Sequence, residues 1–546
     1  MPTQSPRQQL EEIIERTRPK GVIVYPPTLG WSYAHQRPQQ ILKAAAELGY
    51  LCIFCTTQPQ QDQVTDGLRR INERLYIADG IEGITGLQDP ILYITWPLHD
   101  THVGRFVNPL VWYDCIDDLS LFLQELDPVT GAAMIDSDTR LTYEAGIITA
   151  TADKLLEQQR VRRPDAILVE NGTVLADFER TVREEEIPTD IRRILAQGKP
   201  IIGYYGALAD WFDYDMVIEI ARANPQWNIV LIGIDYEGSL ARNKPRLDAL
   251  PNIHFLGRKD YEELYKYSHC FDVGLIPFKR NRIIEATNPV KMFEYMAAGI
   301  PVVSVDIPEA RKYSEVVLTA STVEEYTSQI GRAIALKRDG EYLKRLRQTA
   351  QRSTWCERFK LVDEAIFTIT ERRSQGYALG LEEVVQTNER AIHALSQGDY
   401  GTAVTTLKQL IDRGVRAPWL FFNYAQALIG QGQYSQAVYA LEQEVSVNQH
   451  HLVYSQLAYS YAQVGNFDAA HRYIELAKQT RGTEENWMVS AVYTGIGDMS
   501  QVAEIHFASG RREEAYFTYL CGLMRTPNDA RLRAGFSRVS SALGRT

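Results

Sequence analysis

The residues best suited to carry chemistry lie between positions 281 and 303. Pro289 favours the first position of a helix, which makes Thr287 and Asn288 candidates for the N-cap. The first backbone N–H groups of such a helix have no intrahelical acceptor, and Lys291 adds a positive charge to its first turn. This helix start would therefore attract a phosphate group.

A carboxylate follows on about the same face of that helix. Glu294 lies three residues after Lys291, a spacing that brings two helical side chains together. One carboxylate can accept hydrogen bonds from two neighbouring hydroxyl groups, such as those of a ribose. Gly299 and Pro301 then end the helix and lead into a strand. These features indicate a phosphate site beside a ribose site; the alternative is a solvated pair in an ordinary helix.

Two sections of the chain alternate short apolar runs with segments of helical length. The runs are 21–25, 50–54, 91–95, 110–113, 146–149 and 166–169 in the first section, and 200–205, 228–233, 253–256, 272–276 and 301–305 in the second. Such strands, separated by helices, predict parallel sheets buried on both faces. We therefore predict two successive doubly wound α/β domains, with the cleft between them as the expected site.

From about residue 386 the strand pattern stops and a repeat begins. Each copy has a glycine followed five residues later by an alanine, and the glycines stand at intervals of 34, 33 and 45 residues: Gly398, Gly432, Gly465 and Gly510. Glycine favours the left-handed end of a helix, and the small alanine lets two helices approach closely. The pattern resembles tetratricopeptide repeats over about 386–530, with an insertion near 487–498 expected to explain the longest interval.

Composition argues against several classes of protein. The 546 residues hold 58 Lys plus Arg and 69 Asp plus Glu, a formal net charge of −11 that argues against nucleic-acid binding. Hydrophobic residues make up 45% and charged residues 23%, as in globular proteins, and no run of 18 apolar residues predicts a spanning helix. The polar first twenty residues do not resemble a secretory signal, and six cysteines do not suggest a disulfide framework. A cytoplasmic protein is expected.

Several motifs, taken in order, resemble one family. The segment Asn-Pro-Val-Lys-Met-Phe-Glu-Tyr-Met-Ala-Ala-Gly-Ile-Pro-Val-Val, residues 288–303, resembles the donor-nucleotide motif of GT-B glycosyltransferases, close to the retaining family 4. Segments 203–213, 252–258 and 170–174 resemble further parts of that fold. Segments 35–39 and 113–118 resemble a bacterial subgroup that builds cell-surface polysaccharides. The resemblance covers roughly residues 20–375.

The resemblance implies a donor site for a nucleoside-diphosphate sugar. Glu294 matches the glutamate that binds the donor ribose, and Lys291 with the helix start matches the diphosphate-binding end. Gly206 would let the backbone approach the phosphates, and Arg258 would add a positive charge. The implied donor-binding residues are Gly206, Arg258, Thr287, Asn288, Pro289, Lys291 and Glu294. The resemblance also implies retention of anomeric configuration, with no cofactor and no metal.

The chain departs from the family pattern at two places. Many members carry a glutamate eight residues before the equivalent of Glu294, but Ala286 stands there, with Glu285 one residue away. A histidine often follows the fourth strand of the first domain, where this chain has Asp114 and Asp117. We predict that one of these two aspartates contacts the transferred sugar. Trp31, His35 and Arg37 are expected to line the acceptor side of the cleft.

Plainer interpretations exist for most of these residues. Gly206 could be an ordinary strand–helix turn, Arg258 a surface charge, and the aspartates helix caps. His35 and Arg37 could form a surface helix start. Cys52 and Cys55 lie in an apolar run and are expected in the core, while His99 and His102 lack a zinc-protease pattern.

We therefore predict three parts: a first Rossmann-like domain over 1–180, a donor-nucleotide domain over 181–354, and helical repeats over 386–546. A helix near 355–375 should cross back onto the first domain. The predicted activity is transfer of a sugar to a hydroxyl of a glycan or lipid-linked glycan. The repeats would bind a protein partner, mediate self-association or hold the chain at a membrane surface. The alternatives are a catalytically inactive scaffold and a nucleotide-sugar epimerase.

Overall fold

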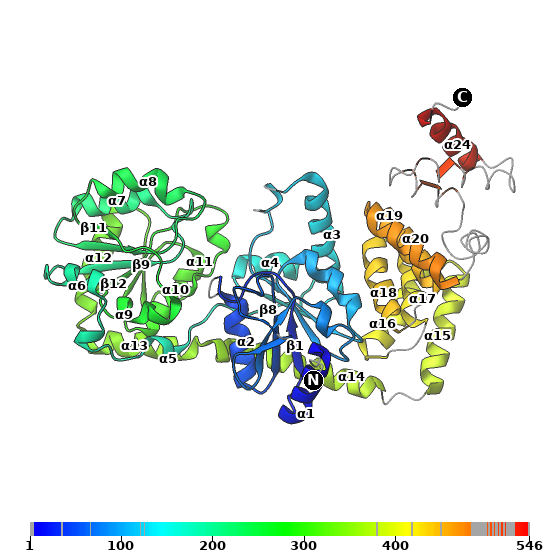
Figure 1. The fold of residues 1–546 in the computed structure, drawn as a ribbon, viewed down its shortest axis with the longest axis horizontal. Coiled ribbons are helices and arrows are strands. Elements are labelled where there is room, and N and C mark those ends of the chain that lie inside the picture. Colours follow the sequence, from blue (N-terminus) through cyan, green and yellow to red (C-terminus); the bar gives the residue numbers. More distant parts are fainter. Residues whose placement is uncertain are drawn as a thin grey trace.

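The computed structural model contains two α/β domains and a helical region, arranged in a row (Figure 1). The second α/β domain lies at one end, the first in the middle and the helical region at the other end. The structure describes residues 5–33, 36–65, 67–120, 122–124, 126–377, 381–415, 419–447, 450–481, 500, 503–504, 507, 512, 515–516, 519 and 530–543.

The first domain is built on an eight-stranded sheet with the order β3-β4-β2-β1-β5-β6-β7-β8. All neighbouring strands pair in parallel except β3 with β4. Its apolar strands are buried on both faces, as a parallel sheet between helices requires. The strands are β1 (Val22–Tyr25), β2 (Leu51–Thr56), β3 (Leu68–Arg70), β4 (Leu75–Asp79), β5 (Ile91–Ile94), β6 (Leu110–Cys115), β7 (Ile147–Ala150) and β8 (Ile167–Leu168).

Helices cover both faces of this sheet. One face packs against α2 (Arg37–Glu47) and α14 (Trp355–Tyr377). The other packs against α1 (Pro6–Thr17), α3 (Pro128–Glu144), α4 (Asp153–Arg160) and the 3₁₀ helix η2 (Pro97–Arg105). The short helix α5 (Leu175–Phe178) begins the passage to the second domain.

The second domain has a six-stranded parallel sheet with the order β11-β10-β9-β12-β13-β14. The strands are β9 (Ile201–Tyr205), β10 (Asn228–Ile232), β11 (Ile253–Phe255), β12 (Val273–Ile276), β13 (Val302–Val305) and β14 (Val317–Ala320). Its helices are α6 (Thr189–Leu195), α7 (Tyr214–Ala223), α8 (Ser239–Asp248), α9 (Leu264–Ser268), α10 (Val290–Ala297), α11 (Pro308–Arg311), α12 (Val323–Leu336) and α13 (Gly340–Arg352). One apolar cluster joins sheet and helices. The predicted fold class, two Rossmann-like domains followed by an all-helical part, is confirmed.

Helix α14 crosses from the second domain back onto the first, as predicted. Its apolar side chains Trp355, Phe359, Val362 and Ile366 are buried against the first sheet. In Figure 1 the helix runs beneath the first domain toward the helical region.

The helical region consists of paired helices. They are α15 (Leu381–Ser396), α16 (Tyr400–Asp412), α17 (Leu420–Gly430), α18 (Tyr434–Val447), α19 (His451–Gln463), α20 (Phe467–Arg481) and α24 (Ala530–Ala542). Gly398, Gly432 and Gly465 follow α15, α17 and α19 with φ of 74°, 74° and 82°, which confirms the predicted left-handed ends. Gly510 and the predicted insertion at 487–498 lie outside the described residues.

Charged side chains dock this region on the first domain. Helix α18 packs against α3 and η2. The buried Arg140 guanidinium lies 2.5 Å from Asp100 within the first domain, and its charge interacts with Glu442 of α18. Tyr461 of α19 donates a hydrogen bond to Glu442, and Ser435 donates one to Asp136 of α3. In the part of the chain that the structure describes, no helix is both long and apolar enough to span a membrane.

Candidate functional site

Three glycines form a row at the carboxyl edge of the second sheet. Gly206 follows β9, and its N–H donates to Ile232 at 2.9 Å; Gly233 follows β10, and its N–H donates to Gly257 beyond β11 at 3.0 Å. A Cβ on Gly233 would lie 1.8 Å from the Gly206 carbonyl oxygen, so only glycine fits. Backbone is therefore bare along this edge, where open parallel sheets bind ligands.

Lys291 reaches this row from the first turn of α10. Its ammonium lies 4.9 Å from the ring centre of Phe278 and 5.3 Å from that of Tyr204. Its Cε lies 3.1 Å from where a Cβ on Gly206 would stand, so the lysine covers the glycine. Burial lowers the pKa of Lys291 to about 8, partly offset by Glu294. A partly desolvated cation above bare backbone is an arrangement suited to an anion.

Glu294 lies on the same helix and is only 6% exposed. Burial raises the pKa of Glu294 to about 7, while the hydroxyl of Tyr205, the charge of Lys291 and the hydroxyl of Tyr261 favour the ionised form. The Tyr205 hydroxyl is buried beside this carboxylate. The carboxylate and this hydroxyl thus provide polar groups that could bind the hydroxyls of an arriving ligand.

The first domain reaches over the same region. Gln40 of α2 donates a hydrogen bond of 3.1 Å to the hydroxyl of Tyr261, and Arg258 donates one of 3.2 Å to the carbonyl of Tyr33. A cavity of about 70 Å³ lies between the domains, lined by Lys43, Asp177, Arg180, Tyr261 and Glu262. The predicted residues Gly206, Lys291 and Glu294 are therefore together, and Arg258 lies along the same sheet edge, exposed to solvent.

The start of α10 differs from the prediction. Pro289 occupies the N-cap position and Val290 is the first helical residue. The Thr287 hydroxyl donates a hydrogen bond of 3.0 Å to the carbonyl of Ile283, four residues earlier, and therefore does not cap α10. Asn288 is 3% exposed, and its side-chain amide donates to Glu309 at 2.7 Å. Neither Thr287 nor Asn288 presents its side chain as a cap.

Arg37 and Asp114 form a buried ion pair. The guanidinium of Arg37 donates to both carboxylate oxygens of Asp114, at 2.7 and 3.1 Å. Tyr93 and Thr149 add hydrogen bonds of 2.8 and 2.6 Å, so the carboxylate of Asp114 is fully occupied and has no exposed surface. The predicted contacts of Asp114 with a sugar and of Arg37 with an acceptor do not fit this geometry. Both side chains are instead part of a buried hydrogen-bond network within the first domain.

Trp31 is also buried. Its ring packs edge-on against Phe54 at 5.2 Å, and its backbone N–H donates to Asp62 at 2.7 Å. The Trp31 side chain therefore belongs to the apolar core of the first domain, whereas it was expected to line an open cleft. His35 lies outside the described residues.

Asp117 is in a different position from Asp114. It is exposed and has no ion-pair or hydrogen-bond partner among the described residues, and nearby protein raises the pKa of its carboxyl by desolvation. The neighbouring Asp118 lies 3.5 Å from Arg282 of the second domain, which places this loop at the domain interface. Asp117 is thus the unoccupied carboxylate of the predicted pair.

Ala286 lies at the same interface. It is 3% exposed and packs in the apolar cluster of the first domain. Glu285, one residue before, points to Arg280 at 3.2 Å and Lys154 at 3.5 Å. The alanine therefore fills a domain contact that a carboxylate would disrupt, and the neighbouring glutamate is paired elsewhere.

The remaining candidates are structural. Cys52 and Cys55 are buried in β2, where desolvation raises their pKa, in agreement with the expected core position. Within the described ranges, no three His, Cys, Asp or Glu side chains form a group that could hold a metal ion.

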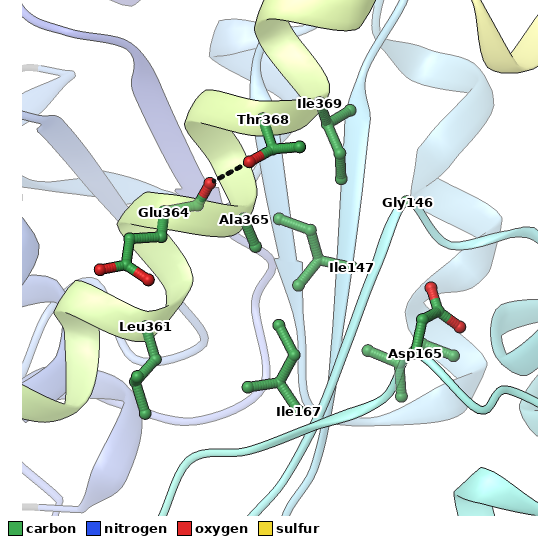
Figure 2. A pocket seen from close by; sticks show the side chains of 10 residues that line it. Gly146, Ile147, Asp165, Ile167, Leu361, Glu364, Ala365, Thr368 and Ile369 are labelled. Carbon is green, nitrogen blue, oxygen red and sulfur yellow. Dashed lines mark hydrogen bonds between the residues drawn. The ribbon is translucent and has the colours of Figure 1, made fainter.

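A second, larger cavity lies away from this edge. It has a volume of about 330 Å³ and lies between α14 and the amino ends of β7 and β8 (Figure 2). Its walls are mostly apolar: Gly146, Ile147, Ile148, Asp165, Ile167, Leu361, Glu364, Ala365, Thr368 and Ile369. Because ligands bind parallel sheets at the carboxyl ends of strands, we place the candidate site at the glycine row instead.

Known proteins are similar to parts of the chain. Residues 187–353 match the family described as Glycosyl transferases group 1. A relative from Bacillus subtilis (strain 168), a putative teichuronic acid biosynthesis glycosyltransferase called TuaH, is 26% identical over 231 residues. That alignment covers 40% of this chain and 56% of the relative.

Solved structures resemble both α/β domains. Sucrose-phosphate synthase from Thermosynechococcus elongatus superposes with a TM-score of 0.50 and 14% identity, covering 64% of this chain and all of that one. HepE from Anabaena, solved in complex with UDP and glucose, gives 0.46 and 12% over 64% of this chain and all of its own. The fold of the two domains is thus the GT-B fold, and residues 187–353 are similar to group 1 glycosyltransferases.

Sequence reasoning missed several residues of the site. Gly233 ends an apolar run as Gly206 does, so the same signal could have identified it. Tyr205, Tyr261 and Gln40 carry no such signal, because their contacts join segments that are far apart in the sequence.

Proposed function

We propose that the chain is a glycosyltransferase that moves a sugar from a nucleoside-diphosphate sugar to an acceptor hydroxyl. The observation that carries the proposal is the convergence of Lys291, the glycine row and Glu294 at one sheet edge. The likeness of residues 187–353 to group 1 glycosyltransferases supports it.

In this proposal the donor nucleotide binds the second domain. Its ribose hydroxyls donate to Glu294 and accept from the neighbouring Tyr205 hydroxyl. Its diphosphate lies over Gly206 and Gly233 near Lys291. The departing diphosphate carries growing negative charge, and Lys291 with the backbone N–H groups at the start of α10 stabilises that charge. No metal is assigned to this step.

The first domain supplies the acceptor side. Asp117 is exposed next to Asp118, which contacts Arg282 of the second domain, and it has no partner among the described residues, so it is our candidate for contact with the transferred sugar. The resemblance to family 4 supports retention of anomeric configuration. The name of the Bacillus relative supports a role in building a surface polysaccharide, with a glycan or lipid-linked glycan as acceptor.

We propose that the helical region has tetratricopeptide-like repeats that bind a protein partner or a second copy of the chain. The intervals of 34 and 33 residues and the left-handed glycines that end α15, α17 and α19 support this. A cytoplasmic location, with peripheral contact to a membrane surface, is part of the same proposal.

Thermal-shift measurements test the donor site. UDP, GDP, ADP, TDP and CMP at millimolar concentration should include one that raises the melting temperature, because a ligand that binds the native state stabilises it. Glu294→Ala should abolish the shift. Glu263→Ala is the control, since Glu263 is exposed and, among the described residues, its carboxylate forms an ion pair with Lys266 on the protein surface.

The outcomes distinguish the alternatives. Nucleotide binding followed by turnover with an acceptor supports the transferase. Binding and conversion of the sugar without an acceptor would identify an epimerase. No shift with any nucleotide would favour the inactive scaffold.

A further inference from the structure

The two chain passages between the α/β domains lie against each other. Thr173 donates its N–H to Ser353 at 3.0 Å, and the Trp355 N–H donates to Thr173 at 3.1 Å. Between them Gly172 approaches so closely that a Cβ would lie 2.8 Å from the Ser353 carbonyl oxygen. Any rotation of one domain against the other therefore passes through this tight joint.

Asn171 adjoins the joint and contacts both domains. Its backbone N–H donates to the side-chain oxygen of Asn288 at 3.1 Å, and its side-chain amide donates to the Asn288 carbonyl at 2.6 Å. Its side-chain oxygen accepts a hydrogen bond of 3.1 Å from Arg37. The side-chain oxygen of Asn171 thus contacts the first domain, and its side-chain nitrogen contacts the second.

Each of these contacts is held in turn by buried groups. On the first-domain side, Arg37 is fixed by its ion pair with Asp114 at the end of β6. On the second-domain side, the Asn288 amide donates to Glu309, which has no exposed surface. The other oxygen of Glu309 accepts from the backbone N–H of Asp153 in the first domain at 2.9 Å. These contacts form a continuous chain of hydrogen bonds from β6 to α11, through Asp114, Arg37, Asn171, Asn288 and Glu309, which we call the relay.

The relay ends at the donor site. Asn288 directly precedes Pro289, the N-cap of α10, and Lys291 lies in the first turn of that helix. Because the Asn288 carbonyl is held by Asn171, the start of α10 is held relative to the first domain. We propose that Asn171 is a positioning residue: it fixes the start of α10, and with it Lys291, so that the diphosphate site is complete only when the domains are closed. This inference rests on the proposed function.

Asn171→Asp tests the relay. The carboxylate keeps an acceptor for Arg37 but cannot donate to the Asn288 carbonyl, so the closed arrangement loses the 2.6 Å bond. Loss of one buried hydrogen bond corresponds to about a tenfold change in an equilibrium constant. We expect the dissociation constant of the nucleoside diphosphate that binds the native chain to rise about tenfold by calorimetry. We also expect the radius of gyration from small-angle scattering to increase.

A matched control separates positioning from general damage. Asn252 is a buried asparagine within the second domain whose amide donates to the carbonyls of Ala221, Asn224 and Trp227. Asn252→Asp should lower the melting temperature without changing the radius of gyration or nucleotide affinity. If Asn171→Asp does not fold, Asn171→Ser, which shortens the side chain so that it no longer spans Arg37 and Asn288, replaces it.

The outcomes are decisive for the inference and separate it from the proposed function. A native chain that binds none of UDP, GDP, ADP, TDP and CMP refutes the proposed function. The radius of gyration of the native chain and of the Asn171 variant can still be compared in that case, and this comparison tests the relay. An unchanged radius of gyration in the Asn171 variant overturns the inference. Equal loss of nucleotide affinity in the Asn171 and Asn252 variants also overturns it, because that result indicates a general structural effect.

Discussion

The pH dependence of nucleotide binding follows from the environment of two residues. Burial lowers the pKa of Lys291 to about 8 and raises the pKa of Glu294 to about 7. In the proposed donor site, diphosphate binding requires the charged lysine, which is lost as pH rises through 8. Ribose binding in that site requires the ionised glutamate, which is lost as pH falls through 7. The affinity should therefore be greatest near pH 7.5.

The expected change is large enough to measure. At about pH 7.5, roughly three quarters of each side chain is charged, and at about pH 9 roughly one tenth of Lys291 remains so. Because the other residue becomes fully charged over the same interval, the association constant should fall about sixfold between these two values, and by a similar factor toward about pH 6 through Glu294.

Isothermal titration calorimetry across this range, at constant ionic strength, makes the comparison. Lys291→Met should bind more weakly and lose the alkaline fall. Glu294→Gln should lose the protein's part of the acidic fall and keep the part due to the ligand's own phosphate, whose second pKa is about 6. A native affinity that is constant between pH 7.5 and 9, or an alkaline fall that persists in Lys291→Met, refutes the assignment of these roles.

Three further predictions concern packing and stability. Gly233→Ala should abolish nucleotide binding and destabilise the chain by roughly 2–4 kcal/mol in chemical denaturation, because its Cβ overlaps the Gly206 carbonyl; native-like stability would contradict the described close approach. Ala286→Glu should cost roughly 2–3 kcal/mol or open the domains in scattering, because it buries a carboxylate in an apolar contact; an unchanged protein would disprove that contact. Burial raises the pKa of Glu442 to about 7, so its native form binds a proton more tightly than the unfolded chain and stability falls as pH rises from about 4.5 to 7. Glu442→Gln should remove up to roughly 3 kcal/mol of this fall between pH 5 and 8, and an identical fall in both proteins would exclude the effect.

The sequence predicted most of the fold because apolar periodicity reports burial directly. It identified the main strands, the crossing helix and the glycine-ended helix pairs. It missed β3, β4 and β14, which have three, five and four residues, because such short strands give little periodicity.

The site was predicted less completely, and the reason is tertiary. Lys291 and Glu294 were identified by their spacing within one helix, which is local. Asn288 and Asp114 were predicted to bind ligands because their types suit capping or sugar contact. In the structure both residues are hydrogen-bonded to partners far away in the sequence, Asn171 and Arg37 respectively. Local pattern gives no information on such partners, so it cannot distinguish a free carboxylate from a buried one.

The docking of the helical region has a consequence for recruitment. A module on a flexible linker raises the effective concentration of its cargo by an amount set by linker length. Here Arg140 and Glu442 are buried together between α3 and α18, so the helical region is packed directly on the first domain. The direction and distance from the helical region to the first domain are then fixed by this packing. A partner bound to the helical region would therefore be held at a fixed position relative to the first domain. How far it extends toward that domain would depend on the size of the partner and not on a linker.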